Sequence, residues 1–156
     1  MSGKNAARGN ICGILLQEER LSIVYNEITL RNALDVGDAR HGRIKEHEIR
    51  QITVQALVDT GAGTVVINEE IRAKLGLDIT GSRPGTLADG AKYSYNLAGP
   101  VEVVWKDRFT TCDAIVLPNA NEVLLGAIPL EGMDLTINPK RELVGVHGDE
   151  ILQRIT

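Results

Sequence analysis

The stretch Ala56-Leu57-Val58-Asp59-Thr60-Gly61-Ala62-Gly63 decides the fold, because an apolar run leads there into a turn with one carboxylate, one hydroxyl and two glycines. Before this turn, residues 51–58 carry apolar side chains at every second position from Ile52 to Val58, which is the period-two pattern of a strand. After it, residues 64–67 are β-branched throughout and predict a second strand. The turn therefore joins two strands.

The Asp59 turn has two interpretations. An aspartate at the end of a buried strand is costly unless its carboxylate is hydrogen-bonded or paired. Gly61 and Gly63 remove Cβ atoms where the turn would clash, and they let amide groups approach the carboxylate. Such a turn can simply reverse the chain, as in many β proteins, or it can present the carboxylate for chemistry.

The neighbouring residues resemble a known family. Ala56-Leu57-Val58-Asp59-Thr60-Gly61-Ala62 is similar to the active-site motif of retropepsin-like aspartic proteases, apolar-apolar-Asp-(Thr/Ser)-Gly-(Ala/Ser). That family places an apolar-apolar-Gly element downstream, before a short helix, and Leu124-Leu125-Gly126 stands there. Between these elements, Leu87-Ala88-Asp89-Gly90 resembles the tip of the flap hairpin. The three elements lie within residues 51–146, and the match is closest to the small, stand-alone prokaryotic proteins of clan AA.

The resemblance implies a mainly β, single-lobed closed barrel with one or two short helices, active as a homodimer. Peptide hydrolysis by carboxylates needs two of them sharing one proton, one as general base on water and one as general acid. The chain holds one Asp-Thr-Gly and no Asp-Ser-Gly, so a second copy must supply the second carboxylate. By resemblance, Asp59 is the catalytic acid/base, Thr60 braces the two loops across the dimer axis, and Gly61 offers its backbone to substrate. Ala62 and Gly63 complete the active-site loop.

Two departures from the family pattern concern specificity. Retroviral members carry acidic residues after Asp-Thr-Gly-Ala, where this chain has Gly63 and Thr64. Many relatives follow the apolar-apolar-Gly element with Arg or Asn, where this chain has Ala127 and Ile128. The expected function is an aspartic endopeptidase acting on a peptide or protein. The alternatives are a catalytically weak dimer that binds peptides, and a structural dimerisation domain whose Asp59 only stabilises a turn.

Composition argues against other partners. The 156 residues are 43% hydrophobic and 24% charged, which fits one globular domain. A net charge of −4 without long blocks, and an aromatic content of 3%, argue against nucleic acid. The apolar run at residues 11–16 is too short for a membrane span or a signal-peptide core. Cys12 and Cys112 lie far apart, so we expect free thiols and a cytoplasmic location.

We expect no metal and no cofactor. His47-Glu48 begins like the helix motif of zinc proteases, but Gln51 stands where the second histidine would be. Cys112 falls on one strand face with Ala114 and Val116, which favours a core thiol over a nucleophile.

The chain divides into an expected flexible tail at residues 1–20, the protease domain at residues 21–146 and a C-terminal tail at residues 147–156. About seven or eight short strands and two short helices predict a mainly antiparallel β domain. Residues 24–30 alternate like a strand, for which an edge position in the sheet is one option, and the polar residues 33–50 fit either a long loop or a short solvated helix. Asn68 and Gly76 have the residue types that begin and end a helix. Residues 80–84 are rich in turn formers.

Overall fold

The computed structural model of the chain describes residues 23–86 and 89–147. Its strands are β1 (Tyr25–Asn32), β2 (Gln51–Val58), β3 (Val65–Ile67), β4 (Asp78–Thr86), β5 (Lys92–Trp105), β6 (Arg108–Val116), β7 (Val123–Leu125), β8 (Leu135–Ile137) and β9 (Leu143–Gly145). Its helices are α2 (Ala33–Arg40), α3 (Glu69–Leu75) and α4 (Ala127–Gly132), with a 3₁₀ turn η1 (Glu46–Glu48). The tails expected at residues 1–20 and 147–156 lie outside the described residues, apart from His147.

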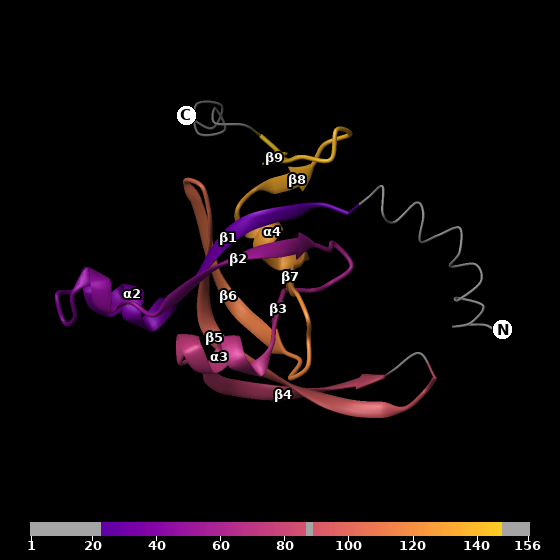
Figure 1. The fold of residues 1–156 in the computed structure, drawn as a ribbon, viewed down its shortest axis with the longest axis horizontal. Helices are drawn as coiled ribbons and strands as arrows, with labels where there is room; N and C mark the ends of the chain where they lie inside the picture. The colour runs from indigo at the N-terminus through magenta and orange to yellow at the C-terminus, as the bar shows by residue number, and fades with distance from the viewer. Residues whose placement is uncertain (1–22, 87–88, 148–156) are drawn as a thin grey trace.

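Six strands close into a barrel (Figure 1). Hydrogen bonding runs in the order β1-β2-β7-β3-β6-β5, and β5 pairs again with β1, with Leu30 opposite Val103. The prediction of a mainly β, closed barrel with short helices is therefore confirmed, although the described residues hold three α-helices where one or two were expected. The expectation that residues 24–30 form an edge strand is wrong, because ring closure gives β1 a neighbour on each side.

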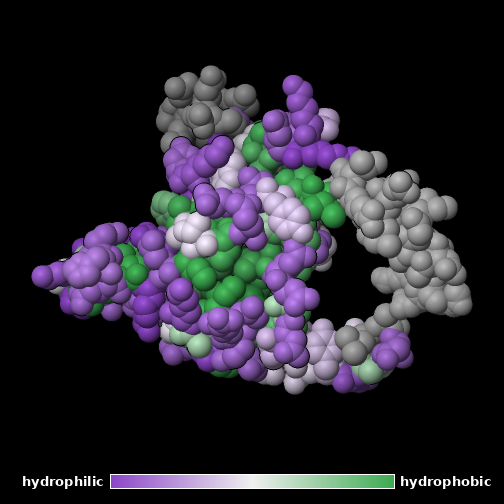
Figure 2. Space-filling model, viewed as in Figure 1, coloured by the Kyte–Doolittle hydropathy of each residue, from purple (hydrophilic) through white to green (hydrophobic). Residues whose placement is uncertain are grey.

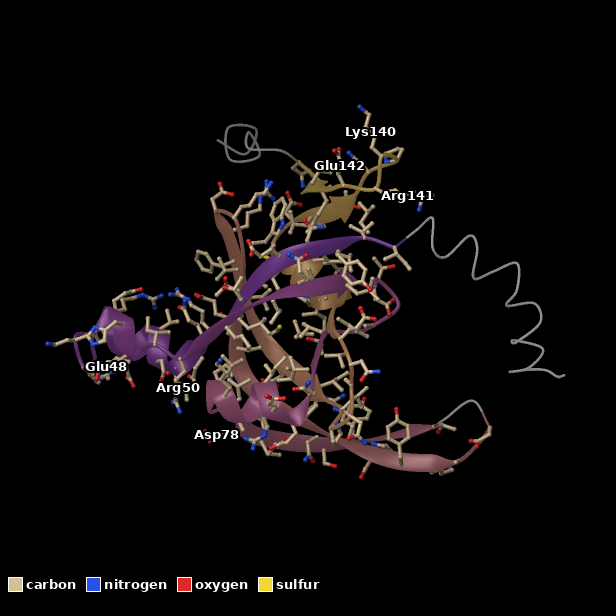
Figure 3. All side chains as sticks on the ribbon, in the orientation of Figure 1. Glu48, Arg50, Asp78, Lys140, Arg141 and Glu142 are labelled. Atoms are coloured by element: carbon tan, nitrogen blue, oxygen red, sulfur yellow. The ribbon has the colours of Figure 1, made fainter. Side chains whose placement is uncertain are left out.

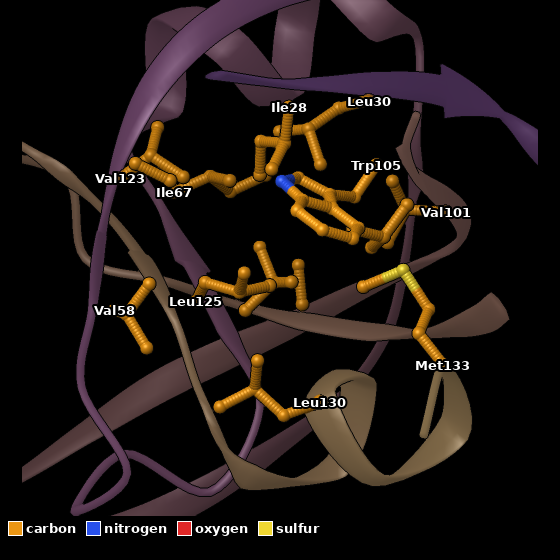
Figure 4. Packing of buried hydrophobic residues seen from close by; sticks show 14 of the residues in the cluster. Ile28, Leu30, Val58, Ile67, Val101, Trp105, Val123, Leu125, Leu130 and Met133 are labelled. Carbon is orange, nitrogen blue, oxygen red and sulfur yellow. The ribbon is translucent and has the colours of Figure 1, made fainter. Parts of the chain in front are cut away.

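Alternate side chains of the barrel strands fill its interior. Val58 of β2 and Leu125 of β7 are buried there, and Figure 4 shows them with Leu130 of α4 and Trp105 of β5 in one cluster. Burial of such side chains is the main favourable contribution to folding. Figure 2 shows apolar residues at the centre of the viewed face, and hydrophilic residues over α2 and over the tip of the β8–β9 hairpin.

The helices begin where side chains can cap them. The Asn68 side chain accepts a hydrogen bond from the amide of Ile71 at 2.8 Å, and Gly76 ends α3 with a φ of 65°, as the sequence predicts. Of the two possibilities for residues 33–50, a helix is present, since α2 begins after Asn32. The carboxylate of Asp35 bonds both the amide and the guanidinium of Arg50, which ties α2 to the start of β2.

Residues 80–84, predicted to be turn-rich, lie inside β4 instead. β4 pairs with β5 from Asp78 to Thr86, with one shift in register between Ile79 and Gly81. Its two glycines and its proline are tolerated because, among the described residues, β4 pairs only with β5, and an outer strand loses little when a residue cannot bond on its free side. The β4–β5 hairpin extends away from the barrel on the side of the β2–β3 turn, and β8 and β9 form a separate sheet (Figure 1).

Candidate active site

Strand β7 lies between β2 and β3, and its last residue is hydrogen-bonded to the Asp59 turn. β7 runs parallel to β2, with Leu124 opposite Leu57, and antiparallel to β3, with Leu124 opposite Val66. The amide of Asp59 donates to the carbonyl oxygen of Leu125 at 3.0 Å. The active-site motif and the apolar-apolar-Gly element, which are far apart in sequence, are therefore joined by backbone hydrogen bonds.

The far side of the turn is bonded to the start of α4. The amide of Ala127 donates to the carbonyl oxygen of Ala62 at 2.9 Å, and the amide of Ile128 donates to that of Gly63 at 3.0 Å. A Cβ on Gly126 would lie 2.3 Å from the carbonyl oxygen of Thr64 and 2.6 Å from that of Ala62. Only glycine allows this backbone contact, which explains why a glycine ends the apolar-apolar-Gly element.

The Asp59 carboxylate is partly exposed at the end of β2. Its Oδ1 accepts a hydrogen bond from the amide of Gly61 at 2.9 Å, and its carbonyl oxygen accepts from the amide of Ala62 at 3.0 Å. A Cβ on Gly61 would approach Oδ1 to 3.2 Å, a tight contact. The turn thus holds one carboxylate oxygen by a backbone donor, while the exposed Thr60 follows it.

Asp59 and Thr60 line an open depression of about 680 Å³. Its other lining residues come from the start of the described chain, from β2, and from β8 and the turn after it: Ile23, Leu57, Val58, Ile137, Asn138, Pro139 and Arg141. No sequence motif links the β8–β9 turn to Asp59, because the two meet only through the fold. Figure 3 shows Lys140, Arg141 and Glu142 at the tip of this hairpin.

Thr64 is a structural residue of the loop. It is buried, and its Oγ1 donates to the carbonyl oxygen of Asp113 at 2.7 Å and lies 3.6 Å from the Cys112 sulfur. It therefore anchors the end of the active-site loop to β6, in the position where retroviral relatives carry an acidic residue. Burial raises the pKa of the Cys112 thiol, which keeps the sulfur protonated and agrees with its interpretation as a core residue.

The proposed flap is described only in part. The Asp89 carboxylate accepts a hydrogen bond from the amide of Ala91 at 2.9 Å, and Gly90 has a φ of 90°, so these residues form the turn that the sequence predicts. Leu87 and Ala88 lie outside the described residues. The arms of the hairpin contribute Arg83, Tyr95 and Leu97 to a second depression, of about 470 Å³, which Gly63 and Thr64 also line. The role of the hairpin as a flap stays a prediction.

Two further findings concern cofactors and membranes. Within residues 23–86 and 89–147, no group of three or more His, Cys, Asp or Glu side chains is placed to hold a metal ion. In the same part of the chain, no helix has the length and apolar character needed to cross a membrane.

Comparison with known proteins identifies a family. No curated protein matches the chain significantly. A family model described as "gag-polyprotein putative aspartyl protease" matches residues 46–131, which is more than half of the 156 residues. The matched range contains the Asp59 turn, the β4–β5 hairpin and Gly126. The chain therefore belongs to the retropepsin-like aspartyl protease family.

Proposed function

We propose that the protein is an aspartic endopeptidase that works as a homodimer, with one Asp59 from each chain. The observation that carries this proposal is the Asp59 carboxylate, presented on a turn bonded to β7 and to α4, in an open depression. Aspartic proteases in general use two carboxylates that share one proton. Each chain offers one such aspartate, so a two-fold axis that passes beside the turn would complete the pair.

The surface around Asp59 supports a second copy as the partner. On one side of the depression, Ile137 and Pro139 from β8 and its turn form an apolar wall. A two-fold contact uses the same patch on both chains, so each apolar wall would meet its own copy. Thr60, which is exposed beside Asp59, would then face the other Thr60 across the axis.

In this dimer the ionised Asp59 accepts a proton from the attacking water, and the protonated Asp59 donates a hydrogen bond to the carbonyl oxygen of the scissile bond. The peptide lies between the active-site loop and the arms of the β4–β5 hairpin. Residues Leu87 to Gly90 are proposed to close over it, and Gly61 to offer its backbone. We also propose a cytoplasmic location, because Cys12 and Cys112 are far apart in sequence and a disulfide is not expected.

The test is cleavage of a diverse peptide library by the purified protein, by Asp59→Asn and by a matched control, Asp107→Asn, in the exposed β5–β6 turn. We expect cleavage by the wild type and by Asp107→Asn, and none by Asp59→Asn. Equal cleavage by Asp59→Asn and the wild type would contradict the proposal.

A catalytically weak, peptide-binding dimer is the second candidate. It is favoured by the two depressions beside the active-site loop, because a peptide can lie in them whether or not Asp59 cleaves it. Peptide binding that is equal in the wild type and Asp59→Asn, with no cleavage by either, would support this candidate over the protease.

A further inference from the structure

A row of outward-facing side chains leads away from Asp59 on the surface of the barrel. Leu57 stands between the buried Ala56 and Val58, so its side chain points to the opposite face of β2. In the register of the sheet, Leu57 is opposite Tyr25 on β1 and opposite Leu124 on β7, and opposite residues share a face. Tyr25, Leu57 and Leu124 therefore form one apolar floor beside the active-site turn.

A carboxylate stands at the far end of this floor. Glu122 precedes Leu124 by two residues, and its Oε1 accepts a hydrogen bond from the Tyr25 hydroxyl at 2.6 Å. This bond spans β2, since Tyr25 belongs to β1 and Glu122 lies just before β7. It holds the carboxylate over the outer face of the sheet, where both residues are exposed.

The apolar floor runs from Asp59 to Glu122, and its length suits one substrate side chain. Leu57 shares the 680 Å³ depression with Asp59, so the floor begins at the proposed active site. The amide of Asp59 bonds to Leu125, three residues beyond Glu122, which places the Cα atoms of Asp59 and Glu122 roughly 10 to 13 Å apart at about 3.3 Å per residue. A side chain that leaves an extended peptide above Asp59 would cross the apolar floor and end near Glu122.

The charge at that end is uncompensated by another side chain. Among the described residues Glu122 has no ion-pair partner, and its one side-chain hydrogen bond is the one from the Tyr25 hydroxyl. The hydrogen bond to Glu122 raises the pKa of Tyr25, so the Tyr25 hydroxyl stays protonated. An aliphatic stem that ends in a cation complements both the floor and this charge, and only Arg and Lys side chains have both.

We infer that Tyr25, Leu57, Leu124 and Glu122 form a specificity site for a basic substrate side chain, Arg or Lys, close to the scissile bond. This inference rests on the proposed function, because it places the substrate over Asp59. It adds a substrate class: peptides with a basic residue near the cleaved bond, held by the Glu122 carboxylate and by packing of the stem on Leu57 and Leu124.

The test uses sets of peptides that differ at one position, which carries Arg, citrulline, norleucine or Glu. This variable position is moved along the peptide from one set to the next. Citrulline keeps the shape of Arg without its charge. Cleavage by the wild type and binding to Asp59→Asn are both measured. We expect a preference for Arg over citrulline at one position, of up to about fivefold for an exposed ion pair, that falls as salt approaches about 1 M.

Variants of Glu122 assign the preference to this site. Glu122→Gln keeps an acceptor for Tyr25 and removes the charge, so the ratio of Arg to citrulline should fall to about one, while Glu122→Lys should favour Glu. Glu70→Gln, an exposed position on α3, should keep the wild-type ratio. Cleavage without a Glu122-dependent preference overturns this inference and leaves the protease standing. A Glu122-dependent preference in binding without cleavage supports this inference and contradicts the protease. The absence of any preference in both measurements overturns the inference.

Discussion

Replacing Gly126 by alanine should destabilise the whole active-site loop. The new Cβ would lie 2.3 Å from the carbonyl oxygen of Thr64, whereas ordinary van der Waals contact begins at 3.4 Å, so the loop must move by about 1 Å. Such overpacking costs about 1–3 kcal/mol. The displacement also weakens the bonds from the amides of Ala127 and Ile128 to the loop, each worth about 1 kcal/mol.

Together these effects predict a loss of about 3 kcal/mol in the free energy of unfolding, or roughly 10 °C in Tm for a domain of this size. The matched control is Gly63→Ala in the same loop, where a Cβ would meet nothing within 4 Å. Its stability should stay within about 0.5 kcal/mol of the wild type. Urea denaturation followed by far-UV circular dichroism measures both variants. If Gly126→Ala unfolds at the same midpoint as Gly63→Ala, the proposed backbone contact is refuted.

Three further predictions concern stability and rate. Asn68→Ala removes the cap of α3 and should cost about 1 kcal/mol in thermal unfolding, and an unchanged Tm would contradict the cap. The hydrogen bond from Arg50 lowers the pKa of Asp35, so this carboxylate stabilises the fold above its unfolded pKa of about 3.9, and the contribution is lost as pH falls through the lower folded value. Wild type and Asp35→Asn should thus differ most near neutral pH and converge below about pH 4, and a constant difference would argue against the ion pair. The rate of peptide cleavage should be bell-shaped in pH, since only a singly protonated pair has both an acid and a base, and a steady rise into alkaline pH would exclude it.

Local patterns predicted the elements that depend on local physics. The alternation at residues 51–58 predicted β2, and Asn68 and Gly76 predicted the ends of α3. These predictions succeeded because alternation and capping involve neighbours in sequence. Residues 80–84 form a strand because β5 pairs with them. This pairing involves residues outside the segment, so the turn-forming residues within it could not predict it.

The parts of the site that belong to sequence motifs could be predicted from the sequence. The resemblance linked the Asp59 turn to Gly126, and the backbone bonds explain why that glycine is needed. The β8–β9 turn beside Asp59 and the Tyr25–Glu122 bond were not predicted. Both depend on the tertiary fold, which brings segments about 80 to 100 residues apart into contact. The pairing of β1 with β2 and of β2 with β7, for example, brings Tyr25 and Glu122 together across a separation of 97 residues.

The central claim is that one active site uses Asp59 from two chains. It is tested by adding Asp59→Asn protein to a fixed amount of wild type, with time for the chains to exchange, and by measuring peptide cleavage. By mass action, random pairing should reduce activity to about one half at equal amounts and to about one tenth at a ninefold excess of the variant. Asp107→Asn, added in the same amounts, should not reduce it. Activity that stays constant as Asp59→Asn is added would show that one chain is sufficient, and would contradict the account.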